Sequence, residues 1–282
     1  MISNEISQNT QLGICSATDW LLIHHCAKAT ERQQMVADIQ IKPGDNVLDL
    51  GCGPGLWSRM FSEYVYPHGR VVGIDGLAES IAYARRSLEQ KPSSEYIEFH
   101  QADFYSIPFD TSSFDITFCG NCLPYVNEPC KLLSEQKRVT KPGGRVISKE
   151  YDGAVLVLHP VDPLLLSKVL YATERALGDR DPKQKYDNVP GRKVRTWFQR
   201  VGYQDITTKA YAIQKYAPLT PEVERYLRLA IEWYGTTGAP YLSHDEKQQW
   251  QAYTDPNSSQ FILDKSDFYY CSLDLMTIGT VE

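Results

Sequence analysis

The sequence predicts an α/β protein built around a parallel sheet. Between about residues 44 and 149, short apolar runs alternate with stretches whose apolar residues recur at helical spacing. This alternation is typical of parallel strands joined by helices. A glycine-rich turn at residues 51–55 follows the first apolar run, and acidic residues end the second and third runs. Parallel strands present their carboxyl ends at one edge of a sheet, so we expect the turn and the acids to share that edge.

The elements follow one another in a regular order. Strands are expected at 46–50, 70–75, 96–103, 114–119 and 145–151, with helices at 56–64, 78–88 and 129–139. The motif KPGG at 141–144 predicts a tight turn before the fifth strand. Beyond that strand, helices are expected at 162–177 and 191–202, and strands near 205–212 and 268–281. Two further helices should separate these last strands, one capped by Thr220 and one opened by a Ser243–Glu246 capping box.

Composition and charge exclude several classes of function. The 282 residues are 42% hydrophobic and carry a formal charge of −6 with no compensating basic block. Because phosphate binding normally needs a Lys- and Arg-rich patch, nucleic acid is not an expected partner. The first residues are polar and lack the layout of a signal peptide, and the longest apolar runs are too short to span a bilayer. We therefore expect a cytoplasmic protein without a membrane span.

The seven cysteines are an odd number scattered through apolar segments, which favours buried, reduced thiols over a disulfide framework. Cys119 and Cys122 have the Cys-x-x-Cys spacing of zinc and redox sites. A zinc site would need a second such pair or suitably spaced histidines, and a redox pair would normally open a helix after a strand. We favour two small residues lining a packed turn, and predict no metal.

The glycine turn and the acids after it suggest a nucleotide with a positive charge. Glycines between a strand and a helix let the backbone approach a ligand closely, although a turn of this kind also occurs without one. A dinucleotide site would place its third glycine where Leu56 stands. Asp75 is positioned to accept both hydroxyls of a ribose, and Asp103 to accept from an adenine amino group while Phe104 covers the base. Asp49 adds a negative charge that disfavours a pyrophosphate and suits a cationic ligand.

Five ordered segments carry a family resemblance: VLDLGCGPG (47–55), VVGID (71–75), ADFYSIPF (102–109), SFDITFCGNCLPYV (113–126) and KRVTKPGGRVI (137–147). In order and spacing they resemble class I S-adenosylmethionine-dependent methyltransferases, most closely the small-molecule branch with ubiquinone- and menaquinone-biosynthesis-type enzymes. The resemblance is strong over about 40–150 and weak over 191–206. It implies a Rossmann-like, seven-stranded, mostly parallel sheet with helices on both faces and an antiparallel last strand. It also implies an N-terminal helical cover and a helical insertion between the last two strands.

The resemblance further implies how S-adenosylmethionine is held. Its methionine part would lie along the backbone of Gly51, Cys52 and Gly53, and Gly55 would permit the turn into the helix. Asp49 would lie near the amino group. The other cofactor residues would be Asp75 at the ribose hydroxyls, Gly76 and Leu77 beside the adenosine, Asp103 at the adenine amine, Phe104 flanking the ring, and Cys119 and Gly120 at the amino end.

We expect one methyltransferase domain over residues 1–282. Its expected parts are an N-terminal helical cover (1–40), a cofactor-binding core (41–152), helices with the sixth strand (153–218), a helical cap insertion (219–262) and the final strand (263–282).

The expected reaction transfers a methyl group to oxygen, carbon or nitrogen of an aromatic, lipid-like or natural-product acceptor. A protic nucleophile needs a base, and our candidates are His24, His25 and Tyr151; adjacent histidines on one helix cannot both face the same way. Candidates for lining the substrate site are Tyr125, Asp152, His159, Trp233 and Tyr234, and Glu150 also lies at the end of the fifth strand.

Alternatives to this reaction stay open. One is a regulatory protein that binds the cofactor without turnover, and another is a nicotinamide-dependent oxidoreductase. The segment Asn121-Cys122-Leu123-Pro124-Tyr125 lacks the paired prolines of adenine and protein-amide N-methyltransferases of this fold, which argues against nucleic-acid amines and glutamine side chains as targets. A homodimer is left open.

Overall fold

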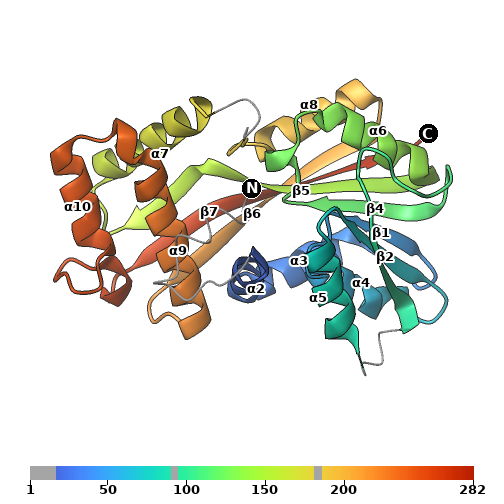
Figure 1. The fold of residues 1–282 in the computed structure, drawn as a ribbon, viewed down its shortest axis with the longest axis horizontal. Helices are drawn as coiled ribbons and strands as arrows, with labels where there is room; N and C mark the ends of the chain where they lie inside the picture. Colours follow the sequence, from blue (N-terminus) through green and yellow to red (C-terminus); the bar gives the residue numbers. More distant parts are fainter. Residues whose placement is uncertain (1–16, 90–94, 181–185) are drawn as a thin grey trace. The chain divides into compact units, whose positions relative to one another are not determined.

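The computed structural model describes residues 17–89, 95–180 and 186–282 (Figure 1). Its seven strands form one sheet in the order β3-β2-β1-β4-β5-β7-β6. The strands are β1 (Asn46–Leu50), β2 (Arg70–Asp75), β3 (Ile97–Gln101), β4 (Phe114–Gly120), β5 (Thr140–His159), β6 (Gln204–Tyr216) and β7 (Tyr269–Thr280). The first five strands pair in parallel and the last is antiparallel, which confirms the predicted fold class. Residues 1–16 of the expected N-terminal cover lie outside the described residues.

Helices occupy the positions between the strands where the sequence predicts them. They are α2 (Ala17–Ala27), α3 (Ala29–Ile39), α4 (Leu56–Val65), α5 (Ala78–Leu88), α6 (Pro129–Val139), α7 (Pro163–Gly178), α8 (Gly191–Val201), α9 (Pro221–Gly238) and α10 (His244–Thr254), with short 3₁₀ turns η3 (Leu123–Tyr125), η5 (Ala239–Tyr241) and η6 (Ile262–Asp264). The helices α9 and α10 separate β6 from β7. None of the described helices is both long enough and apolar enough to cross a membrane.

The chain forms two compact units, each assembled from three separate segments. The sheet unit comprises Ala29–Tyr151, Pro190–Tyr211 and Asp274–Glu282. The helical unit comprises the described residues of Met1–Lys28, Asp152–Val189 and Ala212–Leu273. The strands β5, β6 and β7 contribute residues to both units.

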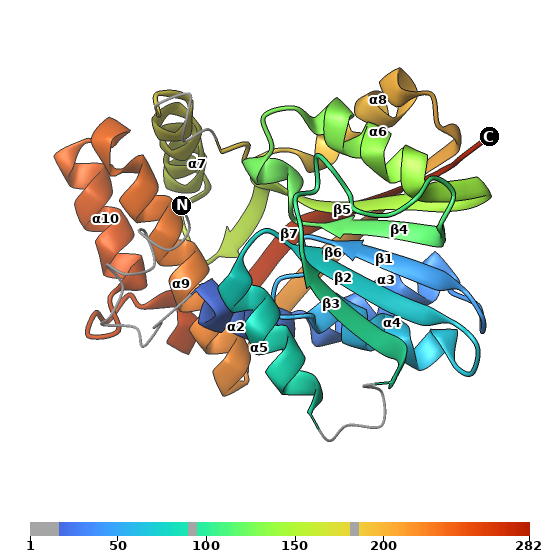
Figure 2. The ribbon, with the colours of Figure 1, turned by 45° about the vertical axis from the view of Figure 1, so that its right-hand side comes forward.

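The sheet unit is a layered α/β structure. The strands β3, β2, β1 and β4 lie side by side (Figure 2). The helices α3, α4 and α5 pack on one face of the sheet, and α6 and α8 pack on the other (Figure 1). Since both faces are covered, the central strand β1 is apolar and buried along nearly its whole length. Its one polar interior residue is Asp49, next to the turn that leaves the strand.

The helical unit is formed largely by α2, α7, α9 and α10, in which α9 contacts the other three helices. Both predicted helix starts are confirmed. The Thr220 hydroxyl accepts from the backbone N–H of Val223, and the Ser243–Glu246 capping box opens α10. These caps satisfy backbone donors that have no partner within the helix.

The fifth strand corrects one expectation. We expected KPGG to be a tight turn before a strand at 145–151, but β5 already begins at Thr140 and continues to His159. The four residues form an irregularity inside the strand, where the pairing with β4 shifts and Gly143 adopts a φ of +75°. The Gly143 N–H donates to the Val281 carbonyl and the Val281 N–H donates to the Gly144 carbonyl, and these backbone hydrogen bonds keep the segment in the sheet.

Candidate functional site

The glycine turn after β1 has a backbone that only glycine adopts easily. Gly51, Gly53 and Gly55 have φ values of +64°, +52° and +75°, in the left-handed region that side chains disfavour. Packing adds a second reason at two of them. A Cβ on Gly51 would lie 2.3 Å from Cys122 Sγ, and one on Gly55 would lie 2.3 Å from the Phe99 ring. The turn is therefore fixed in shape by its glycines and by what packs on them.

Asp75, at the end of β2, joins the turn to the neighbouring strand. Its Oδ2 accepts from the backbone N–H of Gly53 at 2.9 Å, and its Oδ1 accepts from that of Leu77 at 2.8 Å. A carboxylate has about four acceptor positions, so each oxygen keeps capacity for another donor. The side chain is only half-buried, which leaves it accessible to a ligand at this edge.

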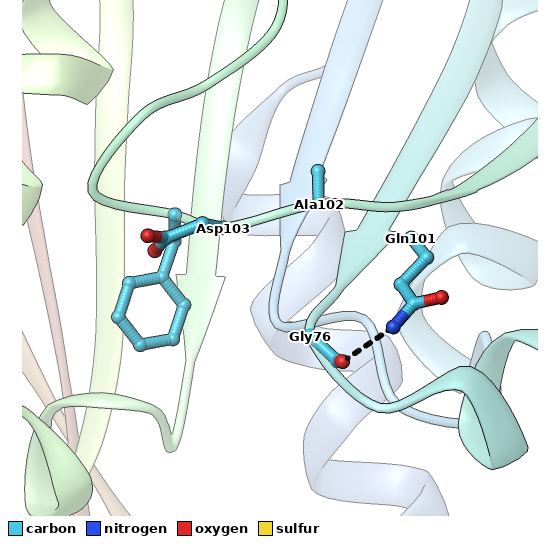
Figure 3. Close-up of a pocket in the computed structure, with 5 residues that line it drawn as sticks. Gly76, Gln101, Ala102 and Asp103 are labelled. Atoms are coloured by element: carbon cyan, nitrogen blue, oxygen red, sulfur yellow. Dashed lines mark hydrogen bonds between the residues drawn. The ribbon is translucent and has the colours of Figure 1, made fainter.

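A cavity of about 490 Å³ lies at the ends of β2 and β3. Its lining is Gly76, Gln101, Ala102, Asp103 and Phe104. Figure 3 shows Gln101, Ala102 and Asp103 following one another at the end of β3, with Gly76 beside them. The Gln101 amide donates to the Gly76 carbonyl at 3.1 Å, and Asp103 accepts from the backbone N–H of Tyr105 at 2.8 Å. Three predicted adenosine-side residues, Gly76, Asp103 and Phe104, thus share one cavity.

Asp49 is buried directly before the turn. The Ser58 hydroxyl on α4 donates to its Oδ2 at 2.6 Å, and only 1% of the residue is exposed. Burial raises the pKa of the Asp49 carboxyl to about 7, because a charge is costly where water is excluded. Near neutral pH this carboxyl is therefore only partly ionised, and a nearby cation would favour its charged form.

The segment after β4 closes the other side of the turn. Cys119 is fully buried, and a Cβ on Gly120 would lie 2.7 Å from the Phe118 ring. The Cys122 thiol donates to the carbonyl of Leu50 at 3.4 Å. Among the described residues, no group of three or more His, Cys, Asp or Glu side chains is placed to hold a metal ion.

These residues fit S-adenosylmethionine on structural grounds. Gly76 has no left-handed φ, and a Cβ on it would meet no atom within 4 Å. Neither backbone nor packing requires glycine there, so its missing side chain leaves the cavity open beside Asp103. The remaining acceptor capacity of Asp75 suits ribose hydroxyls, and the partly ionised Asp49 suits an ammonium group. Leu77 is 62% exposed and Phe104 is half-buried at this same edge.

The candidates for the acceptor side lie in both units. In the sheet unit, Tyr125 is 44% exposed on η3 and Tyr151 is half-buried on β5. In the helical unit, His24 is buried with its ring 5.8 Å from that of Trp20 and 5.4 Å from that of Tyr226. The neighbouring His25 is half-buried, so the two histidines differ in environment, as their adjacent positions on a helix predict.

The other helical-unit candidates have defined partners. Asp152 is buried and accepts from the backbone N–H of Ala154, while the exposed His159 pairs with Asp267 at 3.2 Å. The Trp233 and Tyr234 rings stand edge to face at 5.1 Å. The Tyr234 hydroxyl donates to the carbonyl of Gly153 at 3.0 Å, and burial raises the pKa of this phenol well above its usual range. Tyr234 therefore acts here as a hydrogen-bond donor.

Sequence reasoning missed some residues of this region. Gln101 and Ala102 line the cavity, and their position directly before Asp103 was the available signal. Ser58 binds Asp49 from a helix nine residues later, and nothing in the sequence marked it. Glu150 is buried, and its carboxyl accepts hydrogen bonds from the backbone of the segment after β4.

Comparisons with known proteins agree with this geometry. A model of the family described as Methyltransferase domain matches residues 41–202, more than half of the chain. A demethylmenaquinone methyltransferase of Lactococcus lactis is 36% identical over 121 residues, 43% of this chain and 45% of that protein. The chain spans less than half the length of the first curated relatives that it matches.

Two solved structures show the same fold. The YcgJ protein from Bacillus subtilis matches with a TM-score of 0.55 and 19% identity, over 92% of this chain and 99% of that one. The Haemonchus contortus phosphoethanolamine N-methyltransferase 2, solved with S-adenosylhomocysteine, matches with a TM-score of 0.53 and 19% identity, over 89% and 53%. The family match decides against the nicotinamide-dependent alternative. The chain belongs to the methyltransferase domain family.

Proposed function

We propose that the protein methylates oxygen, carbon or nitrogen of a small organic acceptor of aromatic, lipid-like or natural-product type. The observation that carries this proposal is the aromatic character of the helical unit. The rings of Trp20, His24 and Tyr226 lie within 6 Å of one another, and Trp233 packs on Tyr234. Apolar pockets with few polar groups are typical of small-molecule sites. The Lactococcus relative, named for a demethylmenaquinone acceptor, also supports this class.

We further propose residue roles at the cofactor edge. Asp75 accepts from the ribose hydroxyls, Asp103 accepts from the adenine amino group, and Phe104 flanks the base. Gly76 and Leu77 lie beside the adenosine. The backbone of Gly51, Cys52, Gly53 and Gly55 receives the methionine part, and Asp49, Cys119 and Gly120 lie at its amino end.

When bound, S-adenosylmethionine supplies an electrophilic methyl group. The protein's residues align the acceptor with it, exclude water and, for a protic acceptor, remove a proton. A ring nitrogen of His24 or His25, or the phenol oxygen of Tyr151, is the proposed proton acceptor. Tyr125, Asp152, His159, Trp233 and Tyr234 are the proposed substrate-lining residues. A cytoplasmic location remains a prediction from the sequence, which leaves a homodimer open.

Calorimetric titration with S-adenosylhomocysteine tests the cofactor site. Asp75→Ala should weaken binding at least tenfold, about 1.4 kcal/mol, because it removes both the ribose acceptor and the link to Gly53. Asp115→Ala is the matched control, since this carboxylate also binds a strand backbone but at the amino end of β1. No binding by the wild-type protein would refute the assignment.

A panel of radiolabelled methyl-transfer reactions tests the acceptor class. We expect transfer to one of a set of hydroquinones, catechols and small amines, and none to DNA or RNA oligonucleotides. Bound cofactor without transfer to any acceptor would favour the regulatory alternative. Transfer to an oligonucleotide alone would overturn the small-molecule proposal.

A further inference from the structure

Glu150 is a fully buried carboxyl to which the proposed reaction assigns no part. It lies on β5, one residue after Lys149, which is paired with the last residue of β4, Gly120. Its Oε1 accepts from the backbone N–H groups of Cys122 and Leu123, each at 3.3 Å. A side chain of β5 therefore holds the backbone of the segment that leaves β4.

That same segment forms one wall of the glycine turn. Cys122 Sγ donates to the Leu50 carbonyl at 3.4 Å and occupies the space that a Cβ on Gly51 would need. If Cys122 moved, the turn would lose the contact that packs against Gly51. The shape of the glycine turn thus depends on the position of residues 121–123.

Lys149 fixes the start of the segment. Its carbonyl accepts from the Asn121 N–H at 2.8 Å, and its Nζ donates to Asn121 Oδ1 at 3.0 Å. The Nζ also forms a buried ion pair with Asp274 of β7 at 2.6 Å. Asn121 itself has a left-handed φ of +59°, a conformation that costs energy outside glycine and needs such support.

We propose that Glu150 is a positioning residue for the cofactor: it holds residues 121–123 against the glycine turn, so that the turn keeps the shape that receives the methionine end of S-adenosylmethionine. The role rests on the proposed cofactor site. Glu150 acts through Cys122 and Leu123 and need not touch the ligand.

The environment of Glu150 makes this role depend on pH. Burial, with a smaller contribution from Asp274, raises the pKa of Glu150 to about 8, although the two backbone hydrogen bonds and Lys149 act in the opposite direction. Cys119 and Cys122 also face the carboxyl. Its Oε2 is buried and has no hydrogen-bond partner among the described residues. Ionisation therefore strengthens the bonds to Cys122 and Leu123 and adds negative charge near the proposed ammonium site.

The test is equilibrium binding of S-adenosylhomocysteine from pH 6 to pH 9. Glu150→Leu removes the acceptor for both N–H groups and should weaken binding at least tenfold. Asp115→Leu, which cuts a comparable carboxylate–backbone link at the opposite edge, should change binding less than twofold. Glu150→Gln keeps an acceptor oxygen, so at pH 6 it should bind within threefold of wild type.

The pH profile separates positioning from simple support of the fold. The ratio of wild-type to Glu150→Gln affinity should rise at least threefold between pH 6 and pH 9, because only wild type has an ionisable group at position 150. The titrations of Asp49 and of the ligand affect both proteins equally. A folded Glu150→Leu protein with wild-type affinity would overturn the role. If that variant does not fold, parallel profiles of wild type and Glu150→Gln would overturn it. Absence of binding by wild type would refute the cofactor site, and this role with it.

Discussion

The substitution Gly51→Ala tests whether the glycine turn is fixed by both backbone conformation and packing. At a φ of +64°, a left-handed alanine costs about 1–2 kcal/mol. The added Cβ would also lie 2.3 Å from Cys122 Sγ, and overpacking of this kind costs about 1–3 kcal/mol. We therefore expect Gly51→Ala to lower the free energy of unfolding by about 2–5 kcal/mol.

A second glycine separates the two contributions. Gly143 has a similar φ of +75°, but a Cβ on it would meet no atom within 4 Å. Gly143→Ala should therefore lower the free energy of unfolding only through the strained backbone, by about 1–2 kcal/mol. Adding Cys122→Ala to Gly51→Ala removes the clashing sulfur and should recover about 1–3 kcal/mol relative to the sum of the single variants.

Urea unfolding, analysed by linear extrapolation, measures all four variants. Equal decreases in the free energy of unfolding for Gly51→Ala and Gly143→Ala would refute the packing argument. Strict additivity of Gly51→Ala and Cys122→Ala would refute the specific contact. Losses below about 0.5 kcal/mol at both glycines would refute the conformational argument as well.

Three further substitutions test buried polar groups. Lys149→Met should cost about 3–5 kcal/mol in urea unfolding, because it leaves Asp274 as a buried charge without its ion pair; a loss under 1 kcal/mol would contradict this. The pKa of Asp49 is about 7 in the folded protein, against an ordinary value of 3.8. Its contribution to the free energy of unfolding is therefore complete below pH 3.8 and is lost as the pH rises through 7. The stability of wild type relative to Asp49→Asn should therefore fall by up to about 4 kcal/mol between pH 4 and pH 8, and a flat difference would contradict the raised pKa. Tyr234→Phe should lower the melting temperature, costing about 1–3 kcal/mol because the buried Gly153 carbonyl loses its donor; an unchanged melting temperature would show that the bond contributes nothing.

Much of the sheet was predictable because its signals are local. The alternation of apolar runs and helical spacing placed the first four strands and the helices between them to within a few residues, and the glycine turn and Asp75 indicated the edge that we propose for the ligand. Strand β5 was less predictable. The glycines of KPGG are as suitable for a bulge as for a turn, and only pairing with β4 and Val281 selects the bulge.

The electrostatics of the site were not predictable from local patterns. Sequence reasoning treated Asp49 as a negative charge, whereas burial beside Ser58 raises its pKa to about 7. Glu150 similarly gains its partners from residues 27 and 28 positions earlier. Both effects depend on which side chains the fold brings together and how much water it excludes, and neither quantity is encoded in the spacing of residues.

The discontinuous make-up of the sheet unit has a consequence for synthesis on the ribosome. Its last segment, Asp274–Glu282, supplies the partner of the buried Lys149. While the nascent chain still lacks that segment, Lys149 has no aspartate to neutralise it. The strand β7, which lies between β5 and β6 in the sheet, is also missing. The sheet unit therefore cannot finish folding before the rest of the chain is made. Its last strand leaves the ribosome only after all residues of the helical unit have emerged. A truncated transcript that ends before β7 should accordingly yield a chain recognised by chaperones and proteases.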